Sequence, residues 1–411
     1  MGRIWRYGRV VVLVLLLWPL GCGRKDKVRS LQGVPVVRVR LMANESTVLL
    51  TASKPPTAWP GTGRQRRIEL PRNTPVPLKL TSTGWLIGEE SLGGAGGELP
   101  LQPDGEGTLS VNGRPYRGGY RFVPSATNGS AGGFDVINDV DIDGYLKSVV
   151  SKELLWNWHD EAYRAQAISA RTYALYQWAA VDGAGTFDLH DDVRSQVYGG
   201  IEEESTKSRQ AVDATARVVL AHKTDEGHKV FKAYFSSCCG GVTASASDVF
   251  NEPDVRPLSA RYVGPLCNAS PRFNWGPVVL AKSDVTRRMR LWGAGRQHPL
   301  KDVAEVERID VLKINPHGRP TRFLVTDARG TQYALSGEEM RWSINAGGVV
   351  LNSSFFRPVN EDDTIRFAEG HGWGHGVGMC QWCAQAMAED GLSHEVILLR
   401  SYPGAKLVRA Y

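Results

Sequence analysis

Residues 159–180 (HDEAYRAQAISARTYALYQWAA) carry the strongest helical signal in the chain. The segment is rich in alanine and contains neither glycine nor proline, the two residues that most disfavour a helix interior. Before it, from residue 36 to about residue 140, short apolar runs such as VVRVRL are separated by turn segments such as GGAGG and PDGEG. A long helix after a β-rich region predicts an α+β fold, in which the N-terminal part packs on the rest.

Shorter patterns complete this outline. Further helices are predicted at residues 141–155, at 205–219 with Ser205 as the N-cap, and at 380–390, where Gly391 ends the helix. Strands are predicted at residues 229–237 (KVFKAYFSS), 309–327 (a strand, a turn and a strand) and 364–370 (TIRFAEG).

The first residues have the layout of an export signal. Three arginines in MGRIWRYGR precede the apolar run VVVLVLLLWPLG, which is too short to span a bilayer comfortably. Gly21 before Cys22 resembles a bacterial lipoprotein processing site, so we expect Cys22 to be lipidated. An ordinary signal peptide and an uncleaved anchor are the alternatives. We divide the chain into a leader (1–22), a tether (23–35), a β-rich part (36–135) and a mixed α/β region (136–411), and we expect it to be exported to the cell envelope.

Net charge bears on the expected binding partners, and the number of cysteines bears on the expected disulfide bridges. The 411 residues carry a net charge of +6, but lysine and arginine are dispersed, whereas a nucleic-acid site needs a concentrated basic stripe. We therefore expect no nucleic-acid partner. Without Cys22 the chain has five cysteines, an odd number in a compartment that permits disulfides. At most two bridges can form, so at least one thiol stays free.

Residues 371–384 (HGWGHGVGMCQWCA) combine two histidines, four glycines and two cysteines. The dinucleotide fingerprint needs a glycine at its sixth position, and counting from Gly372 that position is Val377. Cys380 and Cys383 have the spacing of half a zinc site, but no second pair of this kind exists, so we expect no metal and no cofactor. Two alternatives remain: a loop whose backbone N–H groups line a polar cleft, or tight turns between a strand and a helix.

A resemblance joins this loop to an earlier segment. Residues 145–175 (YLKSVVSKELLWNWHDEAYRAQAISARTYAL) resemble the first motif of the SpoIID/LytB family, and residues 371–384 resemble its closing motif. Residues 234–250 (YFSSCCGGVTASASDVF) and 335–345 (LSGEEMRWSIN) are similar to two further segments, in the family's order. The resemblance covers residues from about 36 to 411.

The resemblance implies a peptidoglycan lytic transglycosylase. Such an enzyme cuts glycan strands between N-acetylmuramic acid and N-acetylglucosamine and leaves a 1,6-anhydro end. The family's essential acid falls on Glu153. One carboxyl group suffices, because the muramic sugar's own C6 hydroxyl is the nucleophile. Leu154, Leu155, Trp156 and Trp158 are the apolar walls expected to keep this carboxyl group protonated.

Five further residues are candidates for binding the substrate: Gln166, Arg171, Trp373, His375 and Gln381. For Gln166 and Arg171 the alternative is support of the structure through internal hydrogen bonds. Trp373 either stacks on a sugar or fills the core, and the glycine loop with His375 is expected to form the wall opposite Glu153.

Some relatives hold zinc in a Cys/His cluster that corresponds to His190, Arg194 and Ser195 here, so no zinc is expected at these positions. His190 with Asp191 and Asp192 is a weaker metal candidate, and a capping or salt-bridging role is the alternative. The resemblance also implies a disulfide between Cys239 and Cys267.

Two other functions stay open. LytB-type relatives are modifiers of an amidase, so the chain could be a non-catalytic wall-binding module with a cell-wall amidase as partner. A muramidase would need a second carboxylate, for which Asp160 or Glu161 are the candidates. In each case the expected partners are peptidoglycan glycan strands and, through the N-terminal lipid or signal anchor, a membrane.

Overall fold

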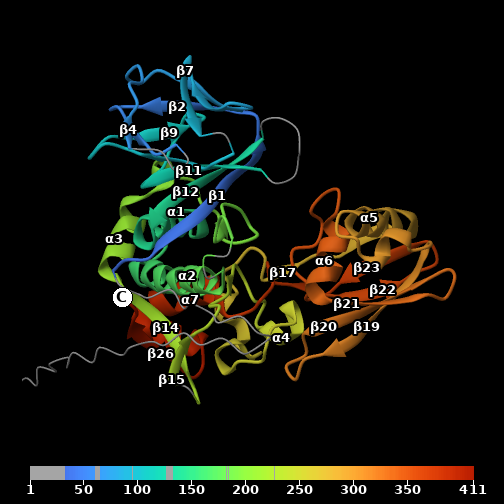
Figure 1. Cartoon of the computed structure of the whole chain (residues 1–411). Coiled ribbons are helices and arrows are strands. Elements are labelled where there is room, and N and C mark those ends of the chain that lie inside the picture. The colour runs from blue at the N-terminus through green and yellow to red at the C-terminus, as the bar shows by residue number, and fades with distance from the viewer. Residues whose placement is uncertain are drawn as a thin grey trace, which may run out of the picture. The chain divides into compact units, whose positions relative to one another are not determined.

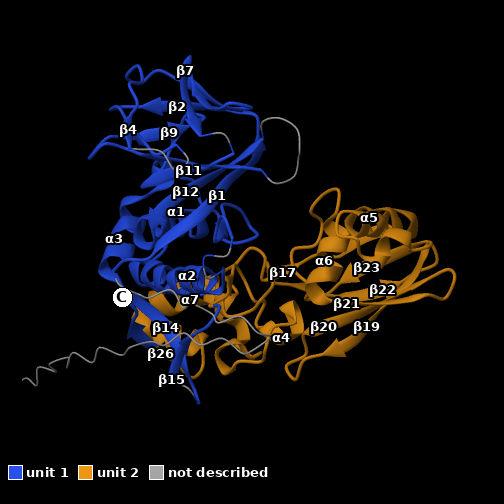
Figure 2. Cartoon of the chain, viewed as in Figure 1, with its two compact units in different colours: residues 1–232, 407–411 blue, residues 233–406 orange. Residues whose placement is uncertain are grey.

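The computed structural model describes residues 33–411, except for residues 61–64, 95, 126–132, 182, 184 and 226. The chain forms two compact units (Figure 2). Unit 1 consists of residues 1–232 and 407–411, and unit 2 of residues 233–406. Both units contain helices and sheets, which confirms the predicted α+β class.

Two sheets form the N-terminal part of unit 1 (Figure 1). The strands of the first sheet, in spatial order, are β13 (Leu189–His190), β1 (Val36–Glu45), β12 (Phe134–Asp141), β11 (Gly119–Pro124), β8 (Leu99–Gln102), β3 (Thr57–Ala58) and β4 (Arg66–Arg67). Those of the second are β10 (Arg114–Pro115), β9 (Leu109–Val111), β2 (Thr47–Ala52), β5 (Val76–Thr81), β6 (Gly84–Ile87) and β7 (Glu90–Gly94).

Aromatic side chains join the two sheets. Trp85 of β6 is fully buried, with its ring 5.2 Å from that of Phe134 in β12 and 6.2 Å from that of Phe122 in β11. The faces of the two sheets therefore pack on one another through large side chains, the arrangement that alternating apolar residues favour.

Three helices of unit 1 follow β12, and the sequence predicts all three. They are α1 (Ile142–Glu153), α2 (Asp160–Val181) and α3 (Thr206–Ala214). The Asp141 carboxylate caps α1 by accepting a hydrogen bond from the Gly144 N–H at 2.7 Å. Ser205 caps α3 in a capping box with Ser208, as its position predicts. Because α1 begins directly where β12 ends, the first sheet fixes where α1 starts and in which direction it runs.

A third sheet completes unit 1. Its central strand is β14 (Val218–Thr224), between β15 (Gly227–Val230) and β26 (Ala405–Arg409). A 3₁₀ turn, η1 (Ile201–Glu203), precedes α3. The last residues of the chain return to unit 1, where the Tyr411 hydroxyl donates a hydrogen bond to the Asp143 carboxylate at 3.3 Å.

Unit 2 has its own apolar core between two three-stranded sheets and two helices. The sheets are β19 (Val306–Ile314), β20 (Pro320–Asp327) and β21 (Gln332–Ser336), and β18 (Val278–Ala281), β23 (Thr364–Ala368) and β22 (Arg357–Asn360). The helices are α5 (Lys282–Ala294) and α6 (Gly337–Asn345), with the 3₁₀ turn η4 (Pro299–Asp302). Stacked rings of Phe323 and Phe356, with centroids 5.0 Å apart, lie in this core.

Shorter elements form the rest of unit 2. They are two strand pairs, β16 (Phe235–Ser236) with β25 (Met379–Cys380) and β17 (Asn274–Trp275) with β24 (Gly370–His371); three helices, α4 (Ala246–Phe250), α7 (Gln381–Glu389) and α8 (His394–Ser401); and the 3₁₀ turns η2 (Arg256–Leu258) and η3 (Gly264–Cys267). The β16–β25 pair is parallel, with Ser236 opposite Cys380. It therefore brings residues 235–239 beside the end of the glycine loop.

Two predicted boundaries differ from the structure. The predicted division at residues 135/136 falls inside β12, which pairs with both β1 and β11 and so cannot be separated from them. The compact units instead divide at residues 232/233. The single strand predicted at residues 229–237 is split into β15 and β16, because the chain leaves unit 1 between them.

The predicted leader with Cys22, and most of the predicted tether, lie outside the described residues. Within the described part of the chain, no helix combines the length and the apolar character needed to cross a membrane.

A buried carboxylate in unit 2 predicts a loss of stability in acid. Burial raises the pKa of Asp327, but hydrogen bonds from the backbone N–H groups of Ala304, Thr331 and Arg329 outweigh it and lower the pKa to about 2. The ordinary value is 3.8, so the carboxylate stabilises unit 2 above about pH 4, and this contribution is lost as the pH falls to about 2. We expect Asp327→Asn to be less stable than the wild type at pH 7 and to approach it at pH 2.

Urea unfolding across this pH range measures the difference. Asp310→Asn is the matched control, because Asp310 lies on β19 with a half-buried side chain that pairs only with the exposed Arg308 among the described residues. An Asp327→Asn deficit that is the same at pH 7 and pH 2 would contradict the assignment.

Candidate functional site

Glu153 is the last residue of α1 and is half-buried. The chain turns to an extended conformation at Leu154, which ends the helix. Burial raises the pKa of Tyr145, two turns earlier on α1, well above its ordinary value, and the charges of Tyr173 and Glu153 act in the same direction. The Tyr145 phenol therefore stays neutral near the Glu153 carboxyl group, and it donates a hydrogen bond to Gln196 at 3.3 Å.

The loop between α1 and α2 differs from the predicted apolar wall. Leu154 and Trp158 are buried, but Leu155 is 52 % exposed and Trp156 is 84 % exposed. Side-chain hydrogen bonds from outside the loop hold it: the Tyr163 hydroxyl donates to the Leu155 carbonyl at 3.0 Å, and the Lys207 ammonium donates to the Trp158 carbonyl at 2.6 Å. Only half of the expected wall is therefore buried, and an exposed indole lies three residues beyond Glu153.

Arg171 is a buried residue that links several segments of unit 1 through hydrogen bonds. Its side chain is fully buried, and its Nε donates to the Asp143 carboxylate at 2.9 Å. Its terminal nitrogens donate to the backbone carbonyls of Val212 and Val218 at 3.1 and 3.2 Å. These contacts favour the alternative of internal support, and substrate binding by Arg171 stays a prediction. Gln166 is likewise fully buried, on the same helix, which favours the same alternative, and its role in substrate binding stays a prediction.

The other predicted substrate residues belong to unit 2. Trp373 is 47 % exposed, with the Arg272 guanidinium 5.5 Å from its ring centroid. His375 is half-buried, and its Nδ1 accepts a hydrogen bond from the Val377 N–H at 3.0 Å, which leaves Nε2 to carry the proton of the neutral ring. Gln381 is buried at the start of α7. Glu153 belongs to unit 1, so the prediction of one cleft between Glu153 and the glycine loop stays a prediction.

The glycines of the loop pack against the protein's own chain. A Cβ atom at Gly376 would lie 2.4 Å from the Arg319 guanidinium, and one at Gly378 would lie 1.9 Å from the Tyr234 carbonyl oxygen. Both residues have a φ of +75°. Arg319 is fully buried and donates to the carbonyls of Cys239, Val242 and His375 at 3.0–3.2 Å. The loop is therefore glycine-rich because it packs tightly against a buried arginine. This supports the alternative in which the glycines form tight turns between a strand and a helix.

Gly376→Ala is expected to destabilise unit 2. The left-handed conformation alone costs about 1–2 kcal/mol for a residue with a side chain, and the methyl group would also displace the Arg319 guanidinium from its carbonyl partners. Chemical denaturation monitored by near-ultraviolet circular dichroism measures the effect.

Gly276→Ala is the matched control, because a Cβ there meets open space and its φ is ordinary. Equal stability of the Gly376→Ala and Gly276→Ala variants would contradict the packing argument.

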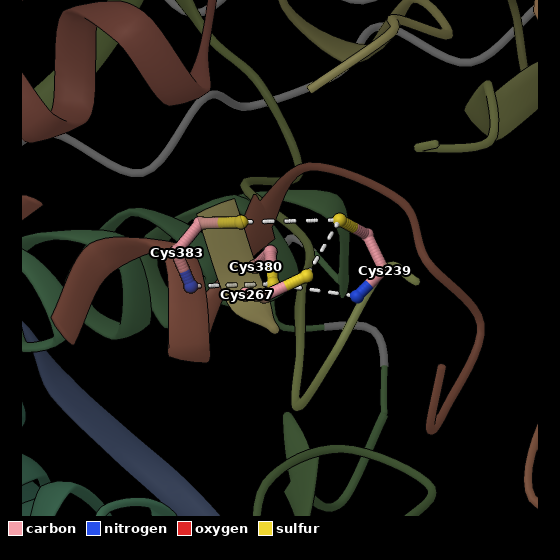
Figure 3. Close-up of side chains that lie close together, drawn as sticks. All are labelled: Cys239, Cys267, Cys380 and Cys383. Carbon is pink, nitrogen blue, oxygen red and sulfur yellow. Dashed lines mark hydrogen bonds between the residues drawn. The ribbon is translucent and has the colours of Figure 1, made fainter. Parts of the chain in front are cut away.

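The arrangement of the cysteines bears on two predictions. Cys239 and Cys267 lie side by side, but their sulfur atoms are 3.6 Å apart and both are free thiols, so the expected disulfide is absent from the structure. The second observation concerns metal ligands: Cys239 and Cys267 lie beside Cys380 and Cys383, for which the sequence shows no second Cys-x-x-Cys pair. The four sulfur atoms lie within 4.8 Å of one another (Figure 3).

Protons are shared unequally among these thiols. Hydrogen bonds from Cys267, Cys380 and Cys383 hold the pKa of Cys239 well below its ordinary value. The bonds with Cys239 and Cys267 raise the pKa of Cys383 above its ordinary value.

The weaker metal candidate at residues 190–192 is not a cluster of ligands. Asp192 accepts hydrogen bonds from the backbone and the guanidinium of Arg194, at 2.7–3.0 Å. Burial lowers the pKa of His190, and the charges of Arg194 and Arg40 lower it further. This geometry corresponds to the capping and salt-bridging alternative.

Comparison with known proteins identifies one family. A family model described as "Stage II sporulation protein" (SpoIID) matches residues 130–222, which include α1 and α2. Stage II sporulation protein D of Bacillus subtilis is 22 % identical over 288 residues, which cover 67 % of this chain and 76 % of that protein.

Two further relatives align over more of the chain. An uncharacterized protein of Brachyspira hyodysenteriae is 27 % identical over 340 residues, which cover 80 % of this chain and 83 % of that protein. The amidase enhancer of Bacillus subtilis is 26 % identical over 349 residues, 76 % of this chain, but the match spans only 47 % of that longer protein.

Proposed function

Because the chain belongs to the SpoIID/LytB family, we propose that it is a peptidoglycan lytic transglycosylase with Glu153 as its only essential acid and base. The substrate would be a glycan strand without stem peptides, cut between N-acetylmuramic acid and N-acetylglucosamine. The observation that most supports this proposal is the position of Glu153: it is half-buried at the end of α1, inside the segment that matches the family model.

The proposed reaction needs one carboxyl group and no water. The Glu153 carboxylic acid gives its proton to the glycosidic oxygen, and the bond from that oxygen to the anomeric carbon of the muramic sugar breaks. The C6 hydroxyl of the same sugar then attacks the anomeric carbon, and the Glu153 carboxylate takes up the hydroxyl proton. The enzyme returns to its starting state and the product carries a 1,6-anhydro ring.

Trp156 supports a role in holding the strand. Its exposed indole lies three residues after Glu153 on a loop fixed by the hydrogen bonds to Leu155 and Trp158. An aromatic ring that is already exposed to solvent can stack on the apolar face of a sugar without a change in the conformation of the loop. Trp373 and His375 remain proposed sugar contacts within unit 2.

The proposed place of action is the cell envelope. The leader pattern of residues 1–22 supports export, and Gly21 before Cys22 supports attachment to a membrane through a lipid. This placement would bring the chain to its peptidoglycan substrate.

A second candidate function rests on a relative. The amidase enhancer aligns with 76 % of this chain. On this alternative the chain stimulates an amidase that acts on the cell wall, and Glu153 is dispensable.

Incubation of the purified chain with peptide-free glycan strands tests the proposal. The lytic reaction predicts fragments with 1,6-anhydro ends, identified by mass. Reducing ends would indicate hydrolysis and contradict it. Intact strands, together with faster release of stem peptides by an added cell-wall amidase from intact peptidoglycan, would support the second candidate instead.

A further inference from the structure

We propose that Cys239, Cys267, Cys380 and Cys383 bind one zinc ion in unit 2. This site is independent of the proposed glycan chemistry, and it uses none of the residues His190, Arg194 and Ser195, which the family resemblance relates to a zinc site. The four ligands come from three separate parts of unit 2: the segment after β16, the end of η3, and the junction of β25 with α7.

The distances between the sulfur atoms fit a single ion. Zinc–sulfur bonds of about 2.3 Å at the corners of a tetrahedron place the sulfur atoms about 3.8 Å apart. The Cys239 sulfur lies 3.6 Å from that of Cys267 and 3.9 Å from that of Cys383. All four sulfur atoms lie within 4.8 Å of one another, and their side chains point toward a common centre (Figure 3).

The same distances argue against two disulfides. A disulfide joins two sulfur atoms at about 2.05 Å and leaves each with a single partner. Here the Cys239 sulfur has two neighbours at nearly equal distances, Cys267 and Cys383, and Cys380 lies in the same group. A shared central ion explains why the Cys239 sulfur has two such neighbours and why all four sulfur atoms lie within 4.8 Å of one another.

Two backbone N–H groups are directed at the Cys380 sulfur. Its sulfur accepts hydrogen bonds from the N–H groups of Cys239 at 3.3 Å and of Cys383 at 3.4 Å. Cys380 is also the N-cap of α7, and Cys383 lies in the first turn of that helix, where the helix dipole favours negative charge. Such outer hydrogen bonds orient metal ligands and stabilise their charged form.

Two cations, the fully buried Arg319 and the half-buried Arg261, balance the charge of the site. Four thiolates around a divalent ion carry a net charge of −2, which is costly to bury without compensation. Arg319 is fully buried and donates to the Cys239 and His375 carbonyls at 3.1 and 3.2 Å. Arg261 lines a cavity of about 150 Å³ together with Cys380 and Cys383, and it donates to the Ser401 carbonyl at 2.6 Å. That cavity also offers a path for the ion to the otherwise buried sulfur atoms.

The composition of the site assigns a structural role to the ion. Four cysteine ligands leave no open position for water or substrate, as in structural zinc sites. The ion would cross-link the segment of Cys239, the turn of Cys267 and the helix that follows the glycine loop. Unit 2 would thus depend on the metal for the position of residues 371–384.

The zinc content of the full chain, purified without chelator, tests the proposal directly. We expect one zinc ion per chain, and alkylation of the four cysteines only after chelation under denaturing conditions. Replacement of the ion by Co²⁺ should give the absorption of a tetrahedral thiolate site. A folded chain without metal, with disulfides among these cysteines in a non-reducing peptide map, would overturn the proposal, as would iron in place of zinc.

Single substitutions identify the ligands. Cys239→Ser and Cys383→Ser are expected to lose most of the bound zinc. Cys238→Ser is the matched control, because Cys238 is adjacent in sequence and equally buried but lies outside the group of four. Full zinc content in Cys239→Ser or Cys383→Ser, or its loss in Cys238→Ser, would contradict the assignment. Where a variant does not fold, the metal content and Co²⁺ spectrum of the wild-type chain decide.

Discussion

Glu153→Gln is expected to abolish cleavage of peptide-free glycan strands while the fold and glycan binding persist. The amide has the shape of the carboxylic acid but cannot give a proton to the leaving oxygen or take one from the C6 hydroxyl. Acid–base catalysis by one group contributes about 10²–10⁴-fold to a rate, and here both steps need the same group. The release of anhydro ends, measured by mass over time, should fall by at least this factor.

Asp160→Asn and Glu161→Gln are the matched controls, because both residues lie in the first turn of α2, a few residues beyond Glu153. Asp160 pairs with Lys207 at 3.5 Å, and Glu161 pairs with Arg164. Cleavage should persist in both variants. If either abolished it as completely as Glu153→Gln, the chain would be a glycosidase with two carboxylates. Undiminished cleavage by Glu153→Gln would contradict the assignment of the acid.

Arg171→Met is expected to destabilise unit 1 severely without a specific effect on substrate affinity. The change leaves the Asp143 carboxylate without its buried cation and removes the donors to the Val212 and Val218 carbonyls. Loss of one partner from such a buried pair costs about 3–5 kcal/mol. Urea unfolding measures this loss, and glycan binding below the unfolding transition measures affinity.

Arg164→Met on the same helix is the control. Its guanidinium pairs with Glu161 and is 37 % exposed, so the expected loss is at most about 1 kcal/mol. A stable Arg171→Met variant with weakened glycan binding would restore the substrate role that its family position implies.

Local patterns predicted the helices around Glu153. The alanine-rich run that became α2 and the Ser205 cap of α3 depend on residues close in sequence. The sequence does not predict helix α5 in the same way. Its segment, Lys282–Ala294, carries several charges and buries only one narrow face, so its apolar pattern is weak. The exposure of Trp156 is also not predicted by the sequence, because the apolar residues next to it indicate a buried wall.

The cysteine cluster shows why long-range sites are harder to predict. A second Cys-x-x-Cys pair is the sequence pattern that would complete a zinc site with Cys380 and Cys383, and the chain has none. Cys239 and Cys267 are 28 residues apart, and they meet the other two only because β16 pairs with β25 and η3 lies near α7. The odd number of cysteines pointed to a thiol outside disulfides, but not to four sulfur atoms around one point. Likewise, the glycines suggested contact with a ligand, whereas their neighbours are Arg319 and the Tyr234 carbonyl.

The source of the oxygen in the cleaved ends tests the central claim most directly. Digestion of peptide-free glycan strands in water enriched in oxygen-18, followed by mass spectrometry of the new muramic ends, distinguishes attack by the sugar's own hydroxyl from attack by water. The proposed action of Glu153 predicts anhydro ends that contain no oxygen-18. Ends that each carry one oxygen-18 atom would show hydrolysis and contradict the claim.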